Sequence, residues 1–203
     1  RSRGLTSQTP KFSLRELGKN FGGIAFPFMR HNFLDGKKTR FIAAEPASCP
    51  KFTKGHFGDD FGDEAGYTPL IPMFTLGHKF MPANIHAGGL RYHGAGGVVS
   101  QLLKDGFMEG MDINQLEAFD SAVLFAKSEG IIPAPESSHA IAATIRRALE
   151  CKESGEKKVL LFNLTGHGLM DMSAYDQYLR GNLINYNISD QEIVNFTDKL
   201  GKL

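Results

Sequence analysis

The chain has 203 residues, of which 41% are hydrophobic and 22% are charged, as expected for one globular domain with a buried core. Its 23 basic and 22 acidic residues give a net charge of +1, which excludes a strongly basic nucleic-acid binder and offers no attraction to an anionic membrane. Two cysteines are too few for a disulfide framework, so we expect a reducing, cytoplasmic location.

Two further features bear on the class of protein. The longest apolar run, residues 159–164, is too short to span a bilayer, and the first twelve residues lack the apolar segment of a secretory signal. Glycine accounts for 23 residues, above the roughly 7% of an average protein. Because these glycines occur in short clusters, they indicate loops where the backbone approaches a ligand.

The N-terminal half contains few clear elements. The first twenty residues show no periodicity, and we predict no element before Phe21. Residues 22–33 predict a helix interrupted at Pro27, and residues 40–44 predict a short buried strand. Residues 46–85 have no sustained period, which is typical of a functional loop or of several short elements.

The C-terminal half is more regular. Residues 95–104 predict a helix and residues 107–113 a strand. Asn114 and Glu117 resemble a capping box that begins a helix ending near Gly130.

Three further elements follow. Ser137 or Ser138 is expected to cap the next helix, and Ser189 with Glu192 to begin the last one. Residues 158–162 are apolar on both faces, which is typical of a central parallel strand. Alternating helices and buried strands predict an α/β fold with an open parallel sheet and flanking helices.

Ligands of such a sheet bind at the carboxyl ends of its strands, and three loops fit that position. Residues 17–23 are rich in glycine and open a helix, so their amides suit a phosphate, although simple packing explains them equally well. Residues 131–139 hold Glu136 between prolines and a helix start, which suits an acid or base or merely complements the helix dipole. Residues 163–168 place the Thr165 hydroxyl after a buried strand.

Two other polar clusters give weaker indications of a functional site. His86 and His93 are seven residues apart without a third ligand at fixed spacing, so we expect no metal site there and favour a structural or substrate-lining role. The acidic run at residues 59–64 falls short of the EF-hand pattern, and we expect it to be a solvated loop.

Seven segments, taken in order, resemble the C-terminal half of the tryptophan synthase β chain, in particular the second branch of that family. They extend from about Asn20 to Gly181: NFGGIAFPF, RFIAAEPASCP, DFGDEAGYTPL, TLGHKF, HAGGLRYHG, EGIIPAPESSHAI and VLLFNLTGHGLMDMSAYDQYL. Arg91 replaces the aspartate of the first branch, which supports the second-branch assignment.

The resemblance implies a fold type II lyase that uses pyridoxal 5'-phosphate and joins indole to L-serine in tryptophan biosynthesis. It further implies a homodimer for the full-length chain, and it leaves a partner α subunit open. On this basis Gly18 and Asn20 match the phosphate cradle, Thr165 with Gly166 matches the group facing the pyridine nitrogen, and Glu136 matches the acid beside the substrate. Lys19 stands where the family has a serine.

The sequence departs from the family in one important respect. The family holds its cofactor as a Schiff base on a lysine in a His-Lys-x-Asn segment, whereas the only His-Lys pair here is His78-Lys79, followed by Phe80-Met81. We therefore do not assign Lys79 this role, and we expect the lysine to belong to a half of the family chain absent from this sequence. Residues 1–17 do not match the family and are expected to be a foreign or frame-altered start, with the enzyme portion at 18–203.

These departures lead us to expect that the chain alone is inactive, binds the cofactor poorly and self-associates. Two alternatives stay open at this point: another fold type II enzyme, such as a serine or threonine dehydratase, and a non-catalytic remnant that serves as a binding module.

Overall fold

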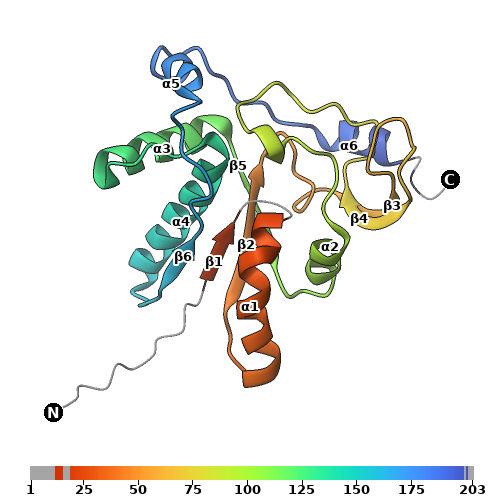
Figure 1. The fold of residues 1–203 in the computed structure, drawn as a ribbon, viewed down its shortest axis with the longest axis horizontal. Helices are drawn as coiled ribbons and strands as arrows, with labels where there is room; N and C mark the ends of the chain where they lie inside the picture. Colours follow the sequence, from red (N-terminus) through yellow and green to blue (C-terminus); the bar gives the residue numbers. More distant parts are fainter. Residues whose placement is uncertain (1–11, 16–18, 199, 201–203) are drawn as a thin grey trace.

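The computed structural model describes residues 12–15, 19–198 and 200. Its larger sheet has four parallel strands in the order β5-β2-β1-β6, and a separate antiparallel hairpin is formed by β3 and β4 (Figure 1). The elements are β1 (Phe12–Arg15), α1 (Lys19–Asp35), β2 (Arg40–Pro46), β3 (His56–Asp60), β4 (Ile71–Thr75), the 3-10 helix η1 (Gly88–Leu90), α2 (Gly97–Lys104), β5 (Glu109–Ile113), α3 (Gln115–Glu129), α4 (Pro135–Ser154), β6 (Leu160–Phe162), α5 (Met172–Leu179) and α6 (Asp190–Thr197). The predicted open parallel sheet with flanking helices is therefore confirmed.

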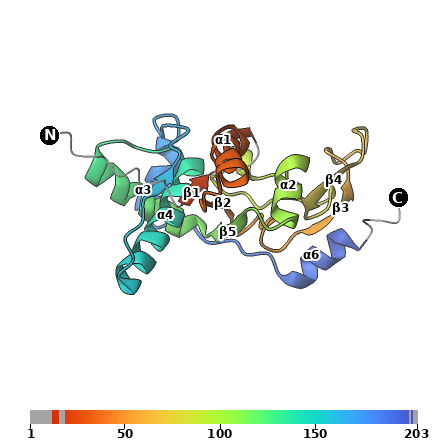
Figure 2. The ribbon, with the colours of Figure 1, turned by 90° about the horizontal axis from the view of Figure 1, so that it is seen from below.

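Strand β2 is covered by helices on both faces, which explains its uninterrupted apolar sequence. Phe41 and Ala43 pack with α1 and α2, whereas Ile42 and Ala44 pack with α3 and α4. Figure 2 shows α1 and α2 on one side of the sheet and α4 on the other. The alternating sides follow from the two-residue period of a strand.

Strand β1 lies in a segment where we predicted no element. It pairs in parallel with β2 on one side and with β6 on the other. Four residues are too few for a periodic signal, and the neighbouring strands supply the hydrogen-bonding partners that fix the segment as a strand.

Strand β6 belongs to the same parallel sheet as β2, as predicted, but its predicted central place is wrong. It is one of the two edge strands of the four described, and Leu161 remains 36% exposed. An apolar sequence indicates that a strand suits burial, but it does not show whether this chain supplies the covering layer.

Helix α1 continues through Pro27, contrary to the predicted interruption. Proline removes one backbone donor from a helix. Here Phe21, Ala25 and Met29 are buried in one cluster against β2, and this packing holds the turns on both sides of Pro27 in a single helix.

The two predicted capping boxes differ in outcome. The predicted capping box of Ser189 and Glu192 is confirmed, whereas Asn114 is an N-cap residue whose side chain makes no capping bond. Instead, Asn185 Oδ1 accepts a hydrogen bond of 3.0 Å from the Leu116 amide, which satisfies a free donor of the first turn.

The serine cap predicted for α4 is wrong. The N-cap is Ala134, and Pro135 takes the first helical position, which suits a residue with fixed φ and no amide donor. Ser137 and Ser138 therefore lie inside the first turn.

The hairpin β3–β4 corrects the expectation of a wholly solvated acidic loop. Asp60 is fully buried and accepts a hydrogen bond of 2.6 Å from Thr75 Oγ1, and the Nδ1 atom of His78 also lies 2.6 Å from its carboxylate.

Within the described residues, no helix is long and apolar enough to cross a membrane.

Candidate active site at the carboxyl edge of the parallel sheet

Two of the three predicted loops meet at the carboxyl end of β6. Thr165 Oγ1 lies 3.1 Å from Ser137 Oγ in the first turn of α4, and the Gly166 amide donates to the same Ser137 oxygen over 3.2 Å. The Gly166 carbonyl in turn accepts from the Ala134 amide over 2.9 Å. Loop 131–139 and loop 163–168 therefore form one hydrogen-bonded unit.

Helix α5 also contacts this unit. The Tyr175 hydroxyl donates to the Pro133 carbonyl over 2.5 Å, and burial raises the pKa of this tyrosine to about 12. The Gly168 amide donates to the Ile132 carbonyl over 2.7 Å. Neither Ser137 nor Tyr175 stands out in the sequence as an organising residue, because their contacts join segments that are about 30 to 40 residues apart.

The third loop reaches the same edge through the sheet order. Helix α1 follows β1, and β1 is the parallel neighbour of β6, so the first turn of α1 and the loop after β6 lie at neighbouring strand ends. Figure 1 shows α1 beginning beside the tips of β1 and β2. Asn20 is exposed in this first turn, while Gly18 lies outside the described residues.

Glu136 is half-buried in the first turn of α4, and its Oε1 lies against Gly88 of η1. A Cβ atom on Gly88 would overlap this carboxylate oxygen, and Gly88 has a φ of +27°. The predicted acid is therefore held between a helix terminus and a glycine loop. The sequence carries a signal for that loop in the pair Gly88-Gly89, but not for its contact with Glu136.

His139 lies one turn further along α4 and is fully buried. Its Nδ1 lies 2.8 Å from the Pro135 carbonyl, and its Nε2 has no hydrogen-bond partner among the described residues. Burial lowers the pKa of this imidazole to about 4, so the ring is neutral at physiological pH.

His86 and His93 take separate structural positions. His93 is buried, with Nε2 2.9 Å from the Phe61 carbonyl, while His86 packs edge-on against Phe119. Lys79 donates to the Glu64 carbonyl over 2.7 Å in the hairpin region. None of these contacts involves Glu136 or Thr165.

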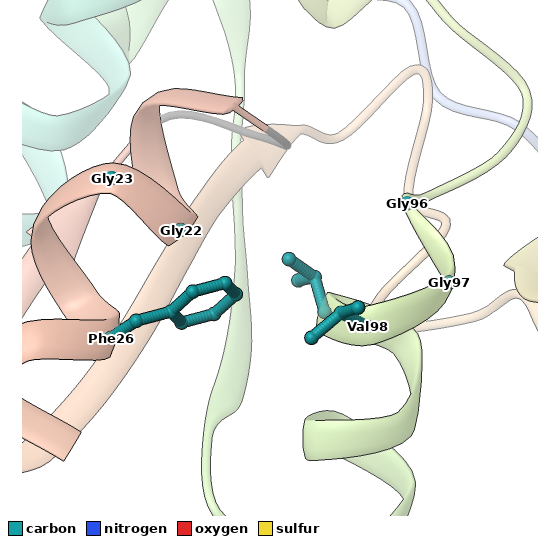
Figure 3. A pocket seen from close by; sticks show the side chains of 7 residues that line it. Gly22, Gly23, Phe26, Gly96, Gly97 and Val98 are labelled. Carbon is teal, nitrogen blue, oxygen red and sulfur yellow. The ribbon is translucent and has the colours of Figure 1, made fainter. Parts of the chain in front are cut away.

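A shallow apolar pocket of about 500 Å³ lies between α1 and α2. In Figure 3, Phe26 and Val98 face each other across it, with Gly22 and Gly23 on one wall and Gly96 and Gly97 on the other. Its described lining carries no ionisable side chain, so this pocket offers no group for acid–base chemistry, in contrast to the edge that holds Glu136.

The described residues fit pyridoxal phosphate in two respects. The first turn of α1 carries no acidic residue, which suits a phosphate at the positive end of the helix, and Thr165 is an exposed residue at the neighbouring strand end.

Comparison with known proteins defines the class. The profile of the family "Pyridoxal-phosphate dependent enzyme" matches residues 17–166, which is most of the chain. The chain therefore belongs to the family of pyridoxal-phosphate dependent enzymes.

Within that class, the chain is similar to tryptophan synthase β chains. It is 54% identical over 170 residues to tryptophan synthase beta chain 2 of Aquifex aeolicus, an alignment that covers 82% of this chain and 39% of the relative. Tryptophan synthase beta chain 2 of Methanosarcina mazei is also 54% identical, over 82% of this chain and 38% of its own length. The chain thus spans less than half the length of these curated relatives.

Solved structures agree on the fold. A fungal L-serine ammonia-lyase from Rhizomucor miehei superposes with a TM-score of 0.58 at 16% identity, covering 86% of this chain and 50% of that one. A threonine deaminase of T.th. gives a TM-score of 0.53 at 16% identity, over 78% and 50% of the two chains. At this identity the likeness concerns the fold alone.

Proposed function

We propose that residues 18–203 are the carboxyl-terminal portion of a tryptophan synthase β chain, which joins indole to L-serine to give L-tryptophan. The observation that carries this proposal is the 54% identity over 170 residues to named β chains. It is supported by the way the structure unites Glu136, Thr165 and the start of α1 at one edge of the sheet.

Each residue at this edge of the sheet has a different proposed role. Gly18, which lies outside the described residues, and Asn20 in the first turn of α1 would hold the phosphate of the cofactor, and Thr165 with Gly166 would hold its ring nitrogen. When bound, pyridoxal phosphate supplies an electron sink for charge that develops on the amino acid. Because the neutral Thr165 hydroxyl has no strongly acidic proton to give to the ring nitrogen, it would moderate that sink, which would favour replacement at Cβ. Glu136 holds and moves the proton of indole.

A dehydratase is the second enzymatic candidate, and the solved structures with this fold include a serine ammonia-lyase and a threonine deaminase. Glu136 distinguishes the two proposals, because dehydration of serine requires no carboxylate to handle indole. The half-buried carboxylate against Gly88 therefore favours the synthase.

Partners and location follow from the same proposal. The substrates are L-serine and indole, the full-length protein is a homodimer, and an α subunit is not required by the site. The location is the cytoplasm, in keeping with Cys49 and Cys151, which are free thiols in the described structure.

Product analysis tests the proposal. The full-length protein containing residues 18–203 is incubated with pyridoxal phosphate, L-serine and indole, and the products are separated by chromatography. We expect tryptophan from the full-length protein and none from the 203-residue chain alone. Pyruvate without tryptophan would establish the dehydratase instead. A protein that forms neither product and shows no cofactor absorbance would be a binding remnant.

A further inference from the structure

The helix η1 forms the wall against which Glu136 rests. Glu136 Oε1 occupies the space that a Cβ atom on Gly88 would need. Gly88 therefore sets how far the carboxylate can extend toward η1. The neighbouring Gly89 has open space around its Cα, so this restriction belongs to Gly88 and not to the whole loop.

A buried lysine fixes η1 in place. Lys51 is 1% exposed, and its Nζ donates to the Leu90 carbonyl over 3.1 Å. Leu90 is also buried with Ile85 and Ala87 in a small apolar cluster. On the other side, the His86 amide donates to Gln115 Oε1 over 2.9 Å. The loop is thus anchored at both ends by buried groups.

The charge of Lys51 has a buried counterpart in Glu45, which is fully buried at the end of β2. The Glu45 carboxylate accepts hydrogen bonds from the Phe52 amide over 2.9 Å and from the amide and hydroxyl of Thr53 over 2.9 and 2.8 Å. Burial raises the pKa of Glu45 and lowers the pKa of Lys51, and the opposite charge of each group counteracts the shift of the other.

We propose that Gly88 and Lys51 are positioning residues for Glu136: Lys51 holds η1 against α4, and the bare backbone of Gly88 sets the place of the Glu136 carboxylate. The inference rests on the proposed function for the role of Glu136, but its geometric part does not. A carboxylate that must exchange a proton with a bound substrate gains from such a fixed support, because small displacements of a reacting group lower turnover strongly.

The kinetic test uses the full-length enzyme and a double-mutant cycle. Gly88→Ala displaces the carboxylate, and we expect it to lower kcat for tryptophan formation by about tenfold or more, with a smaller change in the KM for serine. In the Glu136→Ala background the same substitution has no carboxylate to displace and is expected to change kcat less than about twofold. An equal loss in both backgrounds would overturn the inference.

Two matched substitutions control for glycine replacement itself. Gly89→Ala lies in the same helix with open space, and Gly130→Ala has a positive φ of 72° with open space. Both are expected to retain wild-type kcat, so a loss specific to Gly88→Ala excludes a general effect of added backbone strain.

A structural readout separates this inference from the proposed function. A crystal structure of cofactor-free Gly88→Ala is expected to show the Glu136 carboxylate in a new position, whatever reaction the enzyme performs. A carboxylate left in place would overturn the inference even if tryptophan is formed. Conversely, a displaced carboxylate in an enzyme that makes no tryptophan would refute only the proposed function.

The role of Lys51 is tested by hydrogen exchange. The paired variant Glu45→Gln with Lys51→Met leaves no unpaired buried charge, and we expect faster exchange at the Leu90 and Arg91 amides. Lys54→Met is the control, since Lys54 forms its 2.8 Å ion pair with Asp190 away from η1. Unchanged exchange in η1 would overturn the assignment of Lys51.

Discussion

Ser137 Oγ lies 3.1 Å from Thr165 Oγ1, although the two residues are 28 positions apart in the sequence. The same Ser137 oxygen accepts the Gly166 amide. Because Glu136 precedes Ser137 directly, one side chain fixes the relative positions of the proposed acid and the hydroxyl proposed to face the cofactor ring.

Replacement of Ser137 by Ala is expected to lower the free energy of unfolding by about 1–2 kcal/mol, because a buried hydroxyl shared by two partners is lost. Denaturant titration measures the change. The control is Thr144→Ala in the same helix, whose hydroxyl donates over 2.7 Å to the Ala140 carbonyl one turn earlier. Equal losses for the two variants would show that Ser137 has no special role in joining the loops.

Thr165 tests the proposed contact with the cofactor ring. In the full-length enzyme, Thr165→Val keeps the shape but removes the hydroxyl, and we expect kcat for tryptophan formation to fall by about tenfold, as for loss of one hydrogen bond. Thr165→Ser keeps the hydroxyl and is expected to remain within a few-fold of wild type. Steady-state kinetics with indole and L-serine measure both. Full activity of the valine variant would remove Thr165 from the site.

His139 makes stability depend on pH. Its folded-state pKa of about 4 is below the ordinary 6.5, so the unfolded chain takes up a proton that the folded chain does not. Stability is therefore expected to fall as the pH drops from about 6.5 to 4, by about 3 kcal/mol in total.

The reference for this titration is His139→Asn, whose amide can still donate to the Pro135 carbonyl. Subtracting its unfolding free energy at each pH removes the contributions of other groups, including Glu45, whose raised pKa acts in the opposite direction. A difference that stays constant between about pH 7 and pH 4 would contradict the predicted loss.

Secondary-structure elements could be predicted from the sequence where their pattern is local. Strand β2 was predicted because residues 41–44 form a short apolar run, and α6 because its capping box spans four consecutive residues. Strand β1 was missed because its pairing with β2 and β6 is visible only in the folded sheet.

In the site, too, local features could be predicted from the sequence and long-range contacts could not. Glu136 and Thr165 were identified from the resemblance and from their places at element ends. The contacts of Ser137 with Thr165, of Gly88 with Glu136 and of Lys51 with Leu90 depend on how distant segments pack. Lys51 in particular gives no sign in the sequence that it is buried, since a lysine is ordinarily exposed.

The most direct test of the central claim is the effect of Glu136→Ala in the full-length enzyme on the rate of tryptophan formation from indole and L-serine, with the visible absorbance of the bound cofactor recorded on the same sample. Loss of an acid–base group predicts a rate lower by about 10²-fold or more, with cofactor binding retained. Unchanged turnover in a variant that still binds the cofactor would contradict the account and reduce Glu136 to a stabiliser of the α4 helix dipole.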